Sequence, residues 1–189
     1  MRKGSYWERR KHHLYYRAVY QIVSVVGKDA RSILDVGSAN AEYIRWFDWF
    51  ERRVQLNLAF RGELEGVERI TANFLEWEPQ RFDVTLCLQV LEHVPEVERF
   101  CERLKETAPR LVISVPYKWT AGKHAGHIHD PVDERKLLSW MKVKPNYCMC
   151  VTEPFGPKRM IAYYDLENGP EYKIPRDFVQ AAIAERSMK

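Results

Sequence analysis

The chain has 189 residues, of which 46% are hydrophobic and 30% are charged, and its formal net charge is +4. This size fits one domain with a substantial core and excludes a second full domain. No stretch approaches about 18 apolar residues, and residues 1–10 lack the apolar centre of a signal peptide, so we expect a soluble, cytoplasmic protein without a membrane segment. The four cysteines form no C-x-x-C pair, which favours reduced thiols over a disulfide framework.

The N-terminal segment is strongly basic. Residues 1–28 contain one acid, Glu8, against seven basic residues: Arg2, Lys3, Arg9, Arg10, Lys11, Arg17 and Lys28. A charge run of this kind is usually a solvated helix face, and the alternative is a basic cover over an anionic ligand or a nucleic acid. Apolar residues at helical spacing predict an amphipathic helix over about residues 6–26, ended by Gly27. We therefore assign residues 1–30 to an N-terminal basic helix that could act as a lid.

Five strands are predicted from apolar runs and from alternation, at residues 31–36, 54–58, 67–72, 82–88 and 111–115. Helices are predicted at residues 41–51, 95–107 and 130–141. The first of these is rich in aromatic residues, and Trp49 lies off its apolar stripe, where it could contact the N-terminal helix or a partner. The third begins with Asp130 as N-cap and Pro131 at its first position. Only the stretch from Gly62 to Gly66 separates the second and third strands, so no crossover helix fits there.

The C-terminal part adds a hairpin and a last helix. Strands predicted at residues 147–151 and 159–164 are joined by a short, turn-rich connection, and a helix is predicted over residues 175–186. Strands that alternate with helices indicate a mostly parallel sheet covered on both faces, to which the hairpin adds one antiparallel strand. The expected fold is therefore α/β and doubly wound, in a single domain over residues 1–189 with a core at 31–165 and a C-terminal helix within 166–189.

The strongest functional signal is the segment from Leu34 to Ala41. An apolar strand runs into a turn that contains an acid and a glycine, and a helix is predicted directly after it. Gly37 permits a sharp turn and a close approach of a ligand to the backbone. Ligands of such sheets collect at the carboxyl ends of the strands, where the free amides of a following helix also point. The segment therefore predicts a nucleotide-binding turn.

This turn and a later motif resemble one enzyme family. Asp35-x-Gly37 matches the start of the D-x-G-x-G-x-G turn of class I S-adenosylmethionine-dependent methyltransferases, and the fourth strand runs into Leu91-Glu92-His93-Val94, as in one group of them. The resemblance covers about residues 31–165. It implies a Rossmann-like sheet of seven strands with the last strand antiparallel, and S-adenosyl-L-methionine as cofactor. The chain departs from the family pattern at Ala39 and Ala41, where glycines are usual, and at Asn57, where an acid is usual.

The resemblance also implies the cofactor contacts. The methionine moiety would lie by Asp35, Gly37, Ser38 and Ala39, the ribose by Asn57 and Leu58, and the adenine by Asn73 and Phe74, while Leu88 and Gln89 would close the pocket. Each has a structural alternative: Asp35 could cap a helix, the two asparagines could be turn residues, and Phe74 could belong to the core. An amide at position 57 offers one accepting oxygen, which would weaken ribose binding by on the order of 1 kcal/mol relative to a carboxylate.

Methyl transfer requires alignment of the acceptor and, for a hydroxyl, removal of its proton. The candidate bases follow the fourth and fifth strands, and they are His93, Tyr117, His127 and His129. His93 could instead orient the next helix, and Tyr117 could form an aromatic wall for the acceptor together with Trp119. A metal site in the motif His-x-x-His-x-His-Asp, which ends at Asp130, is disfavoured: that aspartate is explained as an N-cap, and no carboxylate or cysteine completes the ligand set.

The connections of the fold restrict the acceptor. Leu88-Gln89-Val90-Leu91 replaces the Asn/Asp-Pro-Pro-aromatic turn that stacks a flipped base, so a nucleic-acid substrate is disfavoured. Short connections leave no substrate domain, so we expect a small-molecule acceptor methylated at a hydroxyl. The alternatives are a binding module that has lost turnover, suggested by Ala39, Ala41 and Asn57, and a metal-dependent hydrolase built on the histidines. Nicotinamide-dependent chemistry is disfavoured because the turn has no G-x-G-x-x-G.

Overall fold

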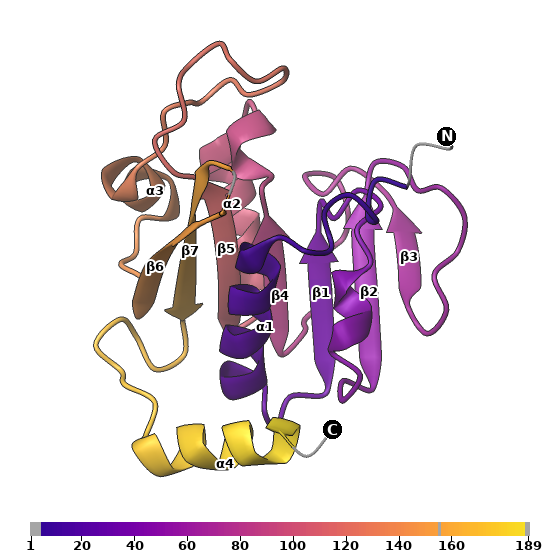
Figure 1. Cartoon of the computed structure of the whole chain (residues 1–189), viewed down its shortest axis with the longest axis vertical. Helices are drawn as coiled ribbons and strands as arrows, with labels where there is room; N and C mark the ends of the chain where they lie inside the picture. The colour runs from indigo at the N-terminus through magenta and orange to yellow at the C-terminus, as the bar shows by residue number, and fades with distance from the viewer. Residues whose placement is uncertain (1–4, 155, 188–189) are drawn as a thin grey trace.

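A single seven-stranded sheet forms the centre of the molecule in the computed structural model, which describes residues 5–154 and 156–187 (Figure 1). The strand order is β3-β2-β1-β4-β5-β7-β6. β7 runs antiparallel to both of its neighbours, and the other neighbouring pairs are parallel. The strands are β1 (Ser32–Val36), β2 (Arg52–Asn57), β3 (Glu68–Thr71), β4 (Val84–Leu88), β5 (Arg110–Pro116), β6 (Tyr147–Thr152) and β7 (Lys158–Asp165). The predicted fold class and the antiparallel last strand are thus confirmed.

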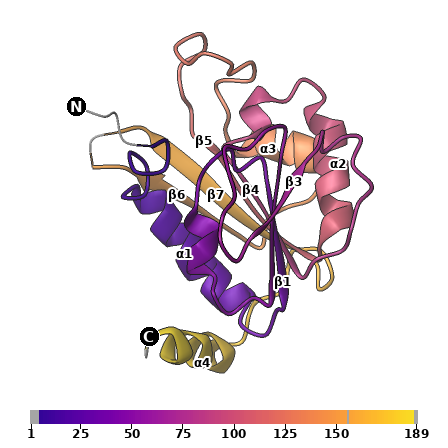
Figure 2. The same ribbon diagram turned by 90° about the vertical axis from the view of Figure 1, so that its right-hand side faces the viewer.

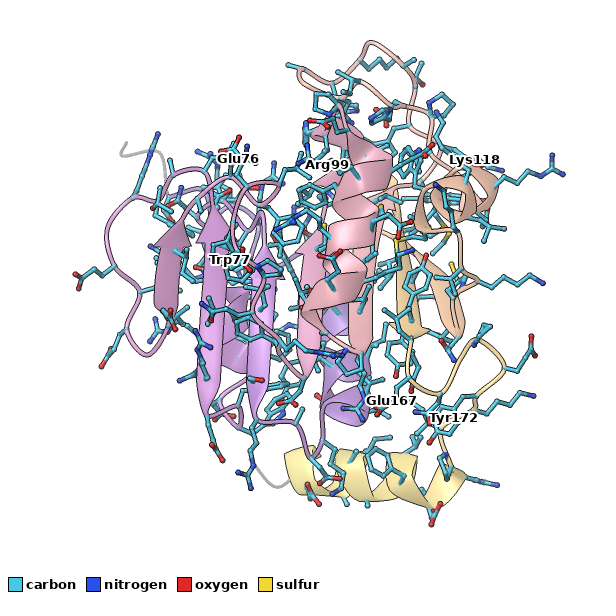
Figure 3. All side chains as sticks on the ribbon, turned by 180° about the vertical axis from the view of Figure 1, so that it is seen from behind. Glu76, Trp77, Arg99, Lys118, Glu167 and Tyr172 are labelled. Carbon is cyan, nitrogen blue, oxygen red and sulfur yellow. The ribbon has the colours of Figure 1, made fainter. Side chains whose placement is uncertain are left out.

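Helices cover both faces of this sheet. α1 (Leu14–Val26) and the short 3-10 helix η1 (Tyr43–Trp46) lie on one face, and α2 (Val97–Thr107) and α3 (Glu134–Met141) lie on the other (Figure 2). α4 (Arg176–Ser187) crosses below the end of the sheet where the parallel strands begin. Figure 3 shows α2 lying over the middle of its face. Within the described residues, no helix combines the length and the apolar character needed to span a membrane.

Side-chain alternation along the strands divides the core into two layers. Leu34 and Val36 of β1 pack toward α2 and α3, whereas Ile33 packs toward α1 and η1. Residues from Leu111 to Val115 of β5 are all buried, as expected for a strand that is covered on both faces. The carboxyl ends of the parallel strands therefore meet at one firmly held edge.

Two predicted helices are wrong in extent. α1 begins at Leu14 rather than near residue 6, and residues 6–12 form turns. After β1, η1 replaces the α-helix predicted over residues 41–51. Aromatic side chains are weak helix formers, and Phe47 and Phe50 are fully buried here although both lie beyond the end of η1. In the described residues, the turn after β1 is therefore not followed by the α-helix whose free N-terminal amides were expected to point over it.

Two single-residue predictions have clear outcomes. Trp49 packs within the chain, with its indole Nε1 donating to the Gly27 carbonyl at 3.0 Å and its ring against Tyr20. Asp130 is not the N-cap of α3. That position belongs to Asp133, whose carboxylate accepts from the Lys136 amide at 2.9 Å. The aspartate at 130 is therefore available for another contact.

Polar side chains take the place of a helix over β2 and β3. Gln55 of β2 is fully buried and donates to the Ala41 carbonyl at 2.7 Å. The same side chain donates to Asp35 at 3.3 Å and accepts from Arg69 Nε at 3.1 Å. This chain of bonds ties the turn after β1 to the sheet without a crossover helix, as the short connection between the two strands predicted.

Candidate active site

A cleft lies along the edge of the sheet where β1, β2, β3 and β4 end. It has an inner lobe of about 260 Å³ and an outer lobe of about 340 Å³. Gly37, Asn57, Val90 and His93 line both lobes, so the two join at these residues. Parallel strands bring their following turns together at this edge, which is where ligands bind in open α/β sheets.

The inner lobe is bounded by the turn after β1, by the end of β4 and by the N-terminal segment. Its lining includes Gly37, Ser38, Ala39, Leu88 and Gln89. These are five of the residues that the resemblance placed around the methionine moiety and at the pocket wall. Leu58, Asn73 and Phe74 line the outer lobe together with Phe100. Asn57, the ninth of these residues, lines both lobes. The structure thus brings nine of the ten predicted cofactor residues into one cleft.

Gly37 has two reasons to be glycine. Its φ of +79° lies in the left-handed region, and a Cβ there would meet Val90 Cγ2 at 2.5 Å. Ala39 stands where the resemblance expects a glycine, and its φ of +52° also lies in the left-handed region. An alanine in that region costs roughly 1–2 kcal/mol, but the backbone path of the turn is kept. The inner lobe stays open although Ala39 and Ala41 both line it.

Two polar groups in the cleft are available to a ligand. Ser38 Oγ is buried and has no hydrogen-bond partner among the described residues. A buried hydroxyl without a partner is costly, and a bound molecule with a polar group would remove that cost. Asn57 uses its Nδ2 to donate to the Ala59 carbonyl at 2.6 Å, which fixes the amide and leaves Oδ1 as an acceptor.

Asp35 does not line the cleft. Its side chain is fully buried beneath the turn and accepts hydrogen bonds from the Tyr43 hydroxyl and from Gln55. Burial raises the pKa of Asp35 to about 7, and the two hydrogen bonds oppose that rise. The residue therefore supports the turn from below, and we expect its replacement to affect stability as well as any ligand.

Replacing Asp35 with asparagine should change the pH dependence of stability. The folded state binds the proton of this carboxyl more tightly than the unfolded state does. The free energy of unfolding therefore falls as the pH rises from about 4 to about 7, and this group causes no further fall above pH 7. Urea unfolding at pH 5 and pH 8 should show the native chain losing on the order of 3 kcal/mol more than Asp35→Asn over this interval. Parallel pH profiles of the two proteins would contradict the assignment.

The residues that line the outer lobe also have a structural role. Asn73 donates to Glu76 at 2.9 Å and accepts from the Leu75 amide at 3.1 Å, so it is a turn residue. Phe74 is buried and packs on Phe100 with ring centroids 4.6 Å apart. Arg103 of α2 donates to the backbone carbonyl of Phe74 at 3.2 Å. α2 thereby holds the floor of the outer lobe in place.

The N-terminal segment forms the roof of the inner lobe. Tyr6, Arg10, Tyr15 and Tyr16 line it from above the turn after β1. The basic-cover interpretation of this segment anticipated Arg10, whereas the two buried tyrosines were not predicted as lining residues. Arg2 and Lys3 of the same basic run lie outside the described residues. The sequence signal for them was their adjacency: two neighbouring side chains on an amphipathic helix point in different directions, so Tyr15 and Tyr16 could not both lie on its apolar face.

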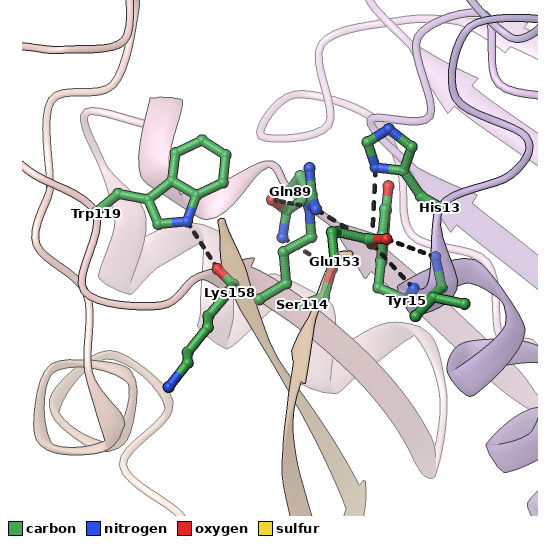
Figure 4. Close-up of polar contacts among 9 residues, drawn as sticks. His13, Tyr15, Gln89, Ser114, Trp119, Glu153 and Lys158 are labelled. Carbon is green, nitrogen blue, oxygen red and sulfur yellow. Dashed lines mark hydrogen bonds and ion pairs between the residues drawn. The ribbon is translucent and has the colours of Figure 1, made fainter. Parts of the chain in front are cut away.

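A buried ion pair attaches this roof to the sheet. Glu153 accepts from the backbone amides of Leu14 at 2.8 Å and Tyr15 at 3.2 Å, and so caps the N-terminus of α1 (Figure 4). Arg159 of β7 bonds to Glu153 at 3.3 Å and to Gln89 at 3.2 Å. Sequence reasoning missed both residues, because the contact between Glu153 and Leu14 spans 139 positions and no local pattern marks it.

The same arginine reaches the loop after β5. Its guanidinium lies 4.6 Å from the ring centre of Tyr15 and 5.5 Å from that of Trp119. Trp119 donates from Nε1 to the Lys158 carbonyl at 2.7 Å (Figure 4). Its ring also stacks on that of His127. Arg159 therefore connects the roof, the end of β4 and the loop over residues 117–130.

The four predicted bases separate into two groups. His93 lines both lobes of the cleft, and its ring lies 4.6 Å from that of His127. His129 turns away, with Nε2 donating to the Val94 carbonyl at 2.8 Å and its ring against Trp140. Tyr117 donates to Glu134 of α3 at 2.9 Å and does not line either lobe. Of the four, the structure therefore places His93 in the cleft and His127 against His93, although His127 itself lines neither lobe.

Solved structures that resemble this one include methyltransferases. No known family model matches the chain, and no curated protein matches it in sequence. The N-methyltransferase NodS from Bradyrhizobium japonicum WM9 in complex with S-adenosyl-L-homocysteine is 12% identical, with a TM-score of 0.63 over 86% of this chain and 88% of NodS. An S-adenosylmethionine-dependent methyltransferase from Mesorhizobium loti is 13% identical, with a TM-score of 0.62 over 81% of this chain and 98% of its own.

A third structure adds a second case with bound product. The N-terminal domain of EvdMO1 with S-adenosyl-L-homocysteine is 14% identical, with a TM-score of 0.55 over 80% of this chain and 79% of that chain. The strand order with its antiparallel β7 and the cleft at the carboxyl edge agree with these likenesses. The chain therefore has the fold of the class I S-adenosylmethionine-dependent methyltransferases.

Proposed function

We propose that this protein is an S-adenosylmethionine-dependent methyltransferase that methylates a hydroxyl group of a small-molecule acceptor. The observation that carries the proposal is the two-lobed cleft on this fold, whose inner lobe is lined by Ser38, a residue with no side-chain hydrogen-bond partner in the part of the chain that the structure describes. Gly37 lines both lobes, and without a Cβ its backbone lets a ligand approach closely. Both features fit the cofactor that the resemblance implies.

The two lobes suit the two ends of this cofactor. The inner lobe would hold the methionine end with Ser38, Ala39 and Gln89, and the outer lobe would hold the adenosine end over Phe74. Asn57 lies where the lobes join, and its Oδ1 can accept from a ribose hydroxyl. The cofactor, when bound, supplies a methyl group that its sulfonium has already activated.

The acceptor side of the site follows from the histidines. Methyl transfer to a hydroxyl releases one proton, and a group beside the cleft has to promote the loss of that proton from the hydroxyl. His93 and His127 lie there, whereas the described part of the chain offers no separate domain to grip a large acceptor. A small molecule approaching between the roof and the loop over residues 117–130 fits this arrangement. The four free cysteines support a reducing compartment, and we propose the cytoplasm.

Calorimetry with S-adenosylmethionine and S-adenosylhomocysteine tests the proposal. We expect saturable binding of both ligands, and about fivefold tighter binding by Asn57→Asp, whose carboxylate turns from the Ala59 carbonyl toward the ribose hydroxyls and accepts from them more strongly by on the order of 1 kcal/mol. Asn40→Asp is the matched control: it adds the same charge at the same edge, and it keeps the oxygen that accepts from the Arg61 amide. Affinity in this control should stay that of the native chain.

Absence of saturable heat with both ligands would refute the proposal in favour of a binding module without cofactor. If binding is found, incubation with S-adenosylmethionine and a metabolite pool should convert one metabolite to its methyl ether, identified by mass spectrometry and fragmentation. A product methylated at nitrogen or carbon would contradict the hydroxyl assignment.

A further inference from the structure

Three side chains of types that can bind a metal ion meet beside the cleft. One ligand atom from each of Glu92, His93 and His127 lies within 4.8 Å of the others. Glu92 and His93 belong to the 3-10 helix η2 (Leu91–His93), which directly follows β4. His127 comes from the loop after β5, and this loop is held on η2 by the Ile128 amide, which donates to the Glu92 carbonyl at 2.9 Å. The cluster is therefore built by two segments that are fixed to each other.

Hydrogen bonds assign the free nitrogen of both imidazole rings. His93 Nδ1 lies 2.8 Å from the Gly126 carbonyl, and His127 Nδ1 lies 2.7 Å from an oxygen of Asp130. Since a carbonyl or a carboxylate only accepts, each Nδ1 carries the proton and donates it. A neutral ring then has its lone pair on Nε2, which is the state of a metal-binding histidine oriented by a carboxylate or a carbonyl.

Glu92 supplies an independent sign of a ligand. Its side chain is 1% exposed, and Oε2 has no hydrogen-bond partner among the described residues. A buried carboxylate oxygen without a partner is strongly unfavourable unless a donor or a cation reaches it. No lysine or arginine forms an ion pair with Glu92 in the described part of the chain, so Oε2 can still accept a donor or bind a cation.

We propose that Glu92, His93 and His127 bind a divalent transition-metal cation that holds the hydroxyl group of the methyl acceptor. Two imidazoles and one carboxylate suit Mn²⁺, Fe²⁺, Co²⁺ or Zn²⁺ better than Mg²⁺, which prefers oxygen ligands. Three protein ligands leave coordination positions open, as in catalytic metal sites. His93 lines both lobes of the cleft, so an acceptor bound to the cation would lie next to the cofactor.

The cation site deepens the proposed function and, for its catalytic role, rests on it. A hydroxyl bound to a divalent cation loses its proton to water more readily than a free one. Its oxygen then forms a bond to the methyl carbon, while the carbon–sulfur bond breaks and its electron pair stays on sulfur. The ligand set differs from the one considered from the sequence: His129 points away, and the missing carboxylate is Glu92.

Metal binding can be measured without turnover. Chelator-treated, tag-free protein should bind one Mn²⁺ per chain. Electron paramagnetic resonance measures this binding as the loss of the signal of free Mn²⁺. Glu92→Gln and His127→Ala should each weaken this binding at least about tenfold. His124→Ala, in the same loop but outside the ligand set, should bind as the native chain does. Far-ultraviolet circular dichroism and thermal unfolding check that each variant is folded.

Three outcomes decide the proposal. Stoichiometric Mn²⁺ with loss in both ligand variants supports it. Substoichiometric binding by the native chain, or unchanged affinity in both folded ligand variants, overturns it. Calorimetry with S-adenosylmethionine on the same chelator-treated protein keeps the two proposals apart: cofactor binding without Mn²⁺ binding refutes only the cation site, and Mn²⁺ binding without cofactor binding refutes only the methyltransferase.

Discussion

Gly37→Ala is expected to weaken the binding of S-adenosylmethionine by at least about 100-fold, close to 3 kcal/mol. The added methyl would sit in the left-handed region of φ and 2.5 Å from Val90 Cγ2. Val90 lines both lobes of the cleft, so any shift that relieves the contact displaces a wall shared by both ends of the ligand. The backbone conformation and the overpacking should together lower the free energy of unfolding by roughly 2–4 kcal/mol.

Gly62→Ala is the matched control for this substitution. Gly62 has nearly the same φ, +73°, but a Cβ there would meet no atom within 4 Å. We expect it to cost only the conformational part, about 1 kcal/mol, with unchanged affinity. Val90→Ala in the Gly37→Ala background should recover part of the lost stability. Calorimetry and urea unfolding check all three, and equal effects of Gly37→Ala and Gly62→Ala on ligand binding would show that the turn does not form the site.

Arg159→Met should destabilise the protein by about 3–5 kcal/mol, because it leaves the Glu153 carboxylate buried without its cation. The arginine is 4% exposed and the glutamate 7%, so water replaces the lost contact poorly. Affinity for S-adenosylmethionine should fall as well, since Gln89 loses its bond from Arg159 and the roof over the inner lobe loses its anchor. Equilibrium unfolding in urea measures the first effect and calorimetry the second.

A double variant distinguishes an unpaired charge from lost packing. Glu153→Gln together with Arg159→Met removes both charges and should restore most of the stability lost in Arg159→Met alone. Arg52→Met is the control for an exposed pair: Arg52 and Glu68 lie 3.0 Å apart, but both are about half exposed. That substitution should cost less than about 1 kcal/mol. Equal costs for Arg159→Met and Arg52→Met would contradict the role given to the buried pair.

The sheet and most of the cleft were predictable from local patterns. Strand periodicity predicted the seven strands, and the turn at Gly37 together with Asn57, the last residue of β2, located the edge where the lobes meet. Sequence patterns failed where tertiary contacts override them. The aromatic periodicity over residues 41–51 resembled a helix, yet burial of Phe47 and Phe50 produced only η1.

Long-range contacts explain the remaining differences. Asp35 reads as a ligand-binding acid beside a glycine, but Tyr43 and Gln55 enclose it from two other segments. Glu92 was not counted with the histidines because it lies more than thirty positions before His127, and only the packing of the loop on η2 brings them together. Spacing along the chain does not carry such information.

The connection of α1 to the last hairpin has a consequence for biosynthesis. β6 has β7 as its neighbour in the sheet and therefore cannot join before β7, which is made after it, has inserted beside β5. Glu153 and Arg159, which fasten the start of α1, arrive with that hairpin. A nascent chain that has emerged only as far as β5 can pair five parallel strands, but the N-terminal segment that forms the roof of the inner lobe is not yet fixed in place. We expect ligand-binding competence to appear abruptly and late in translation, when the residues that follow Lys158 leave the ribosome.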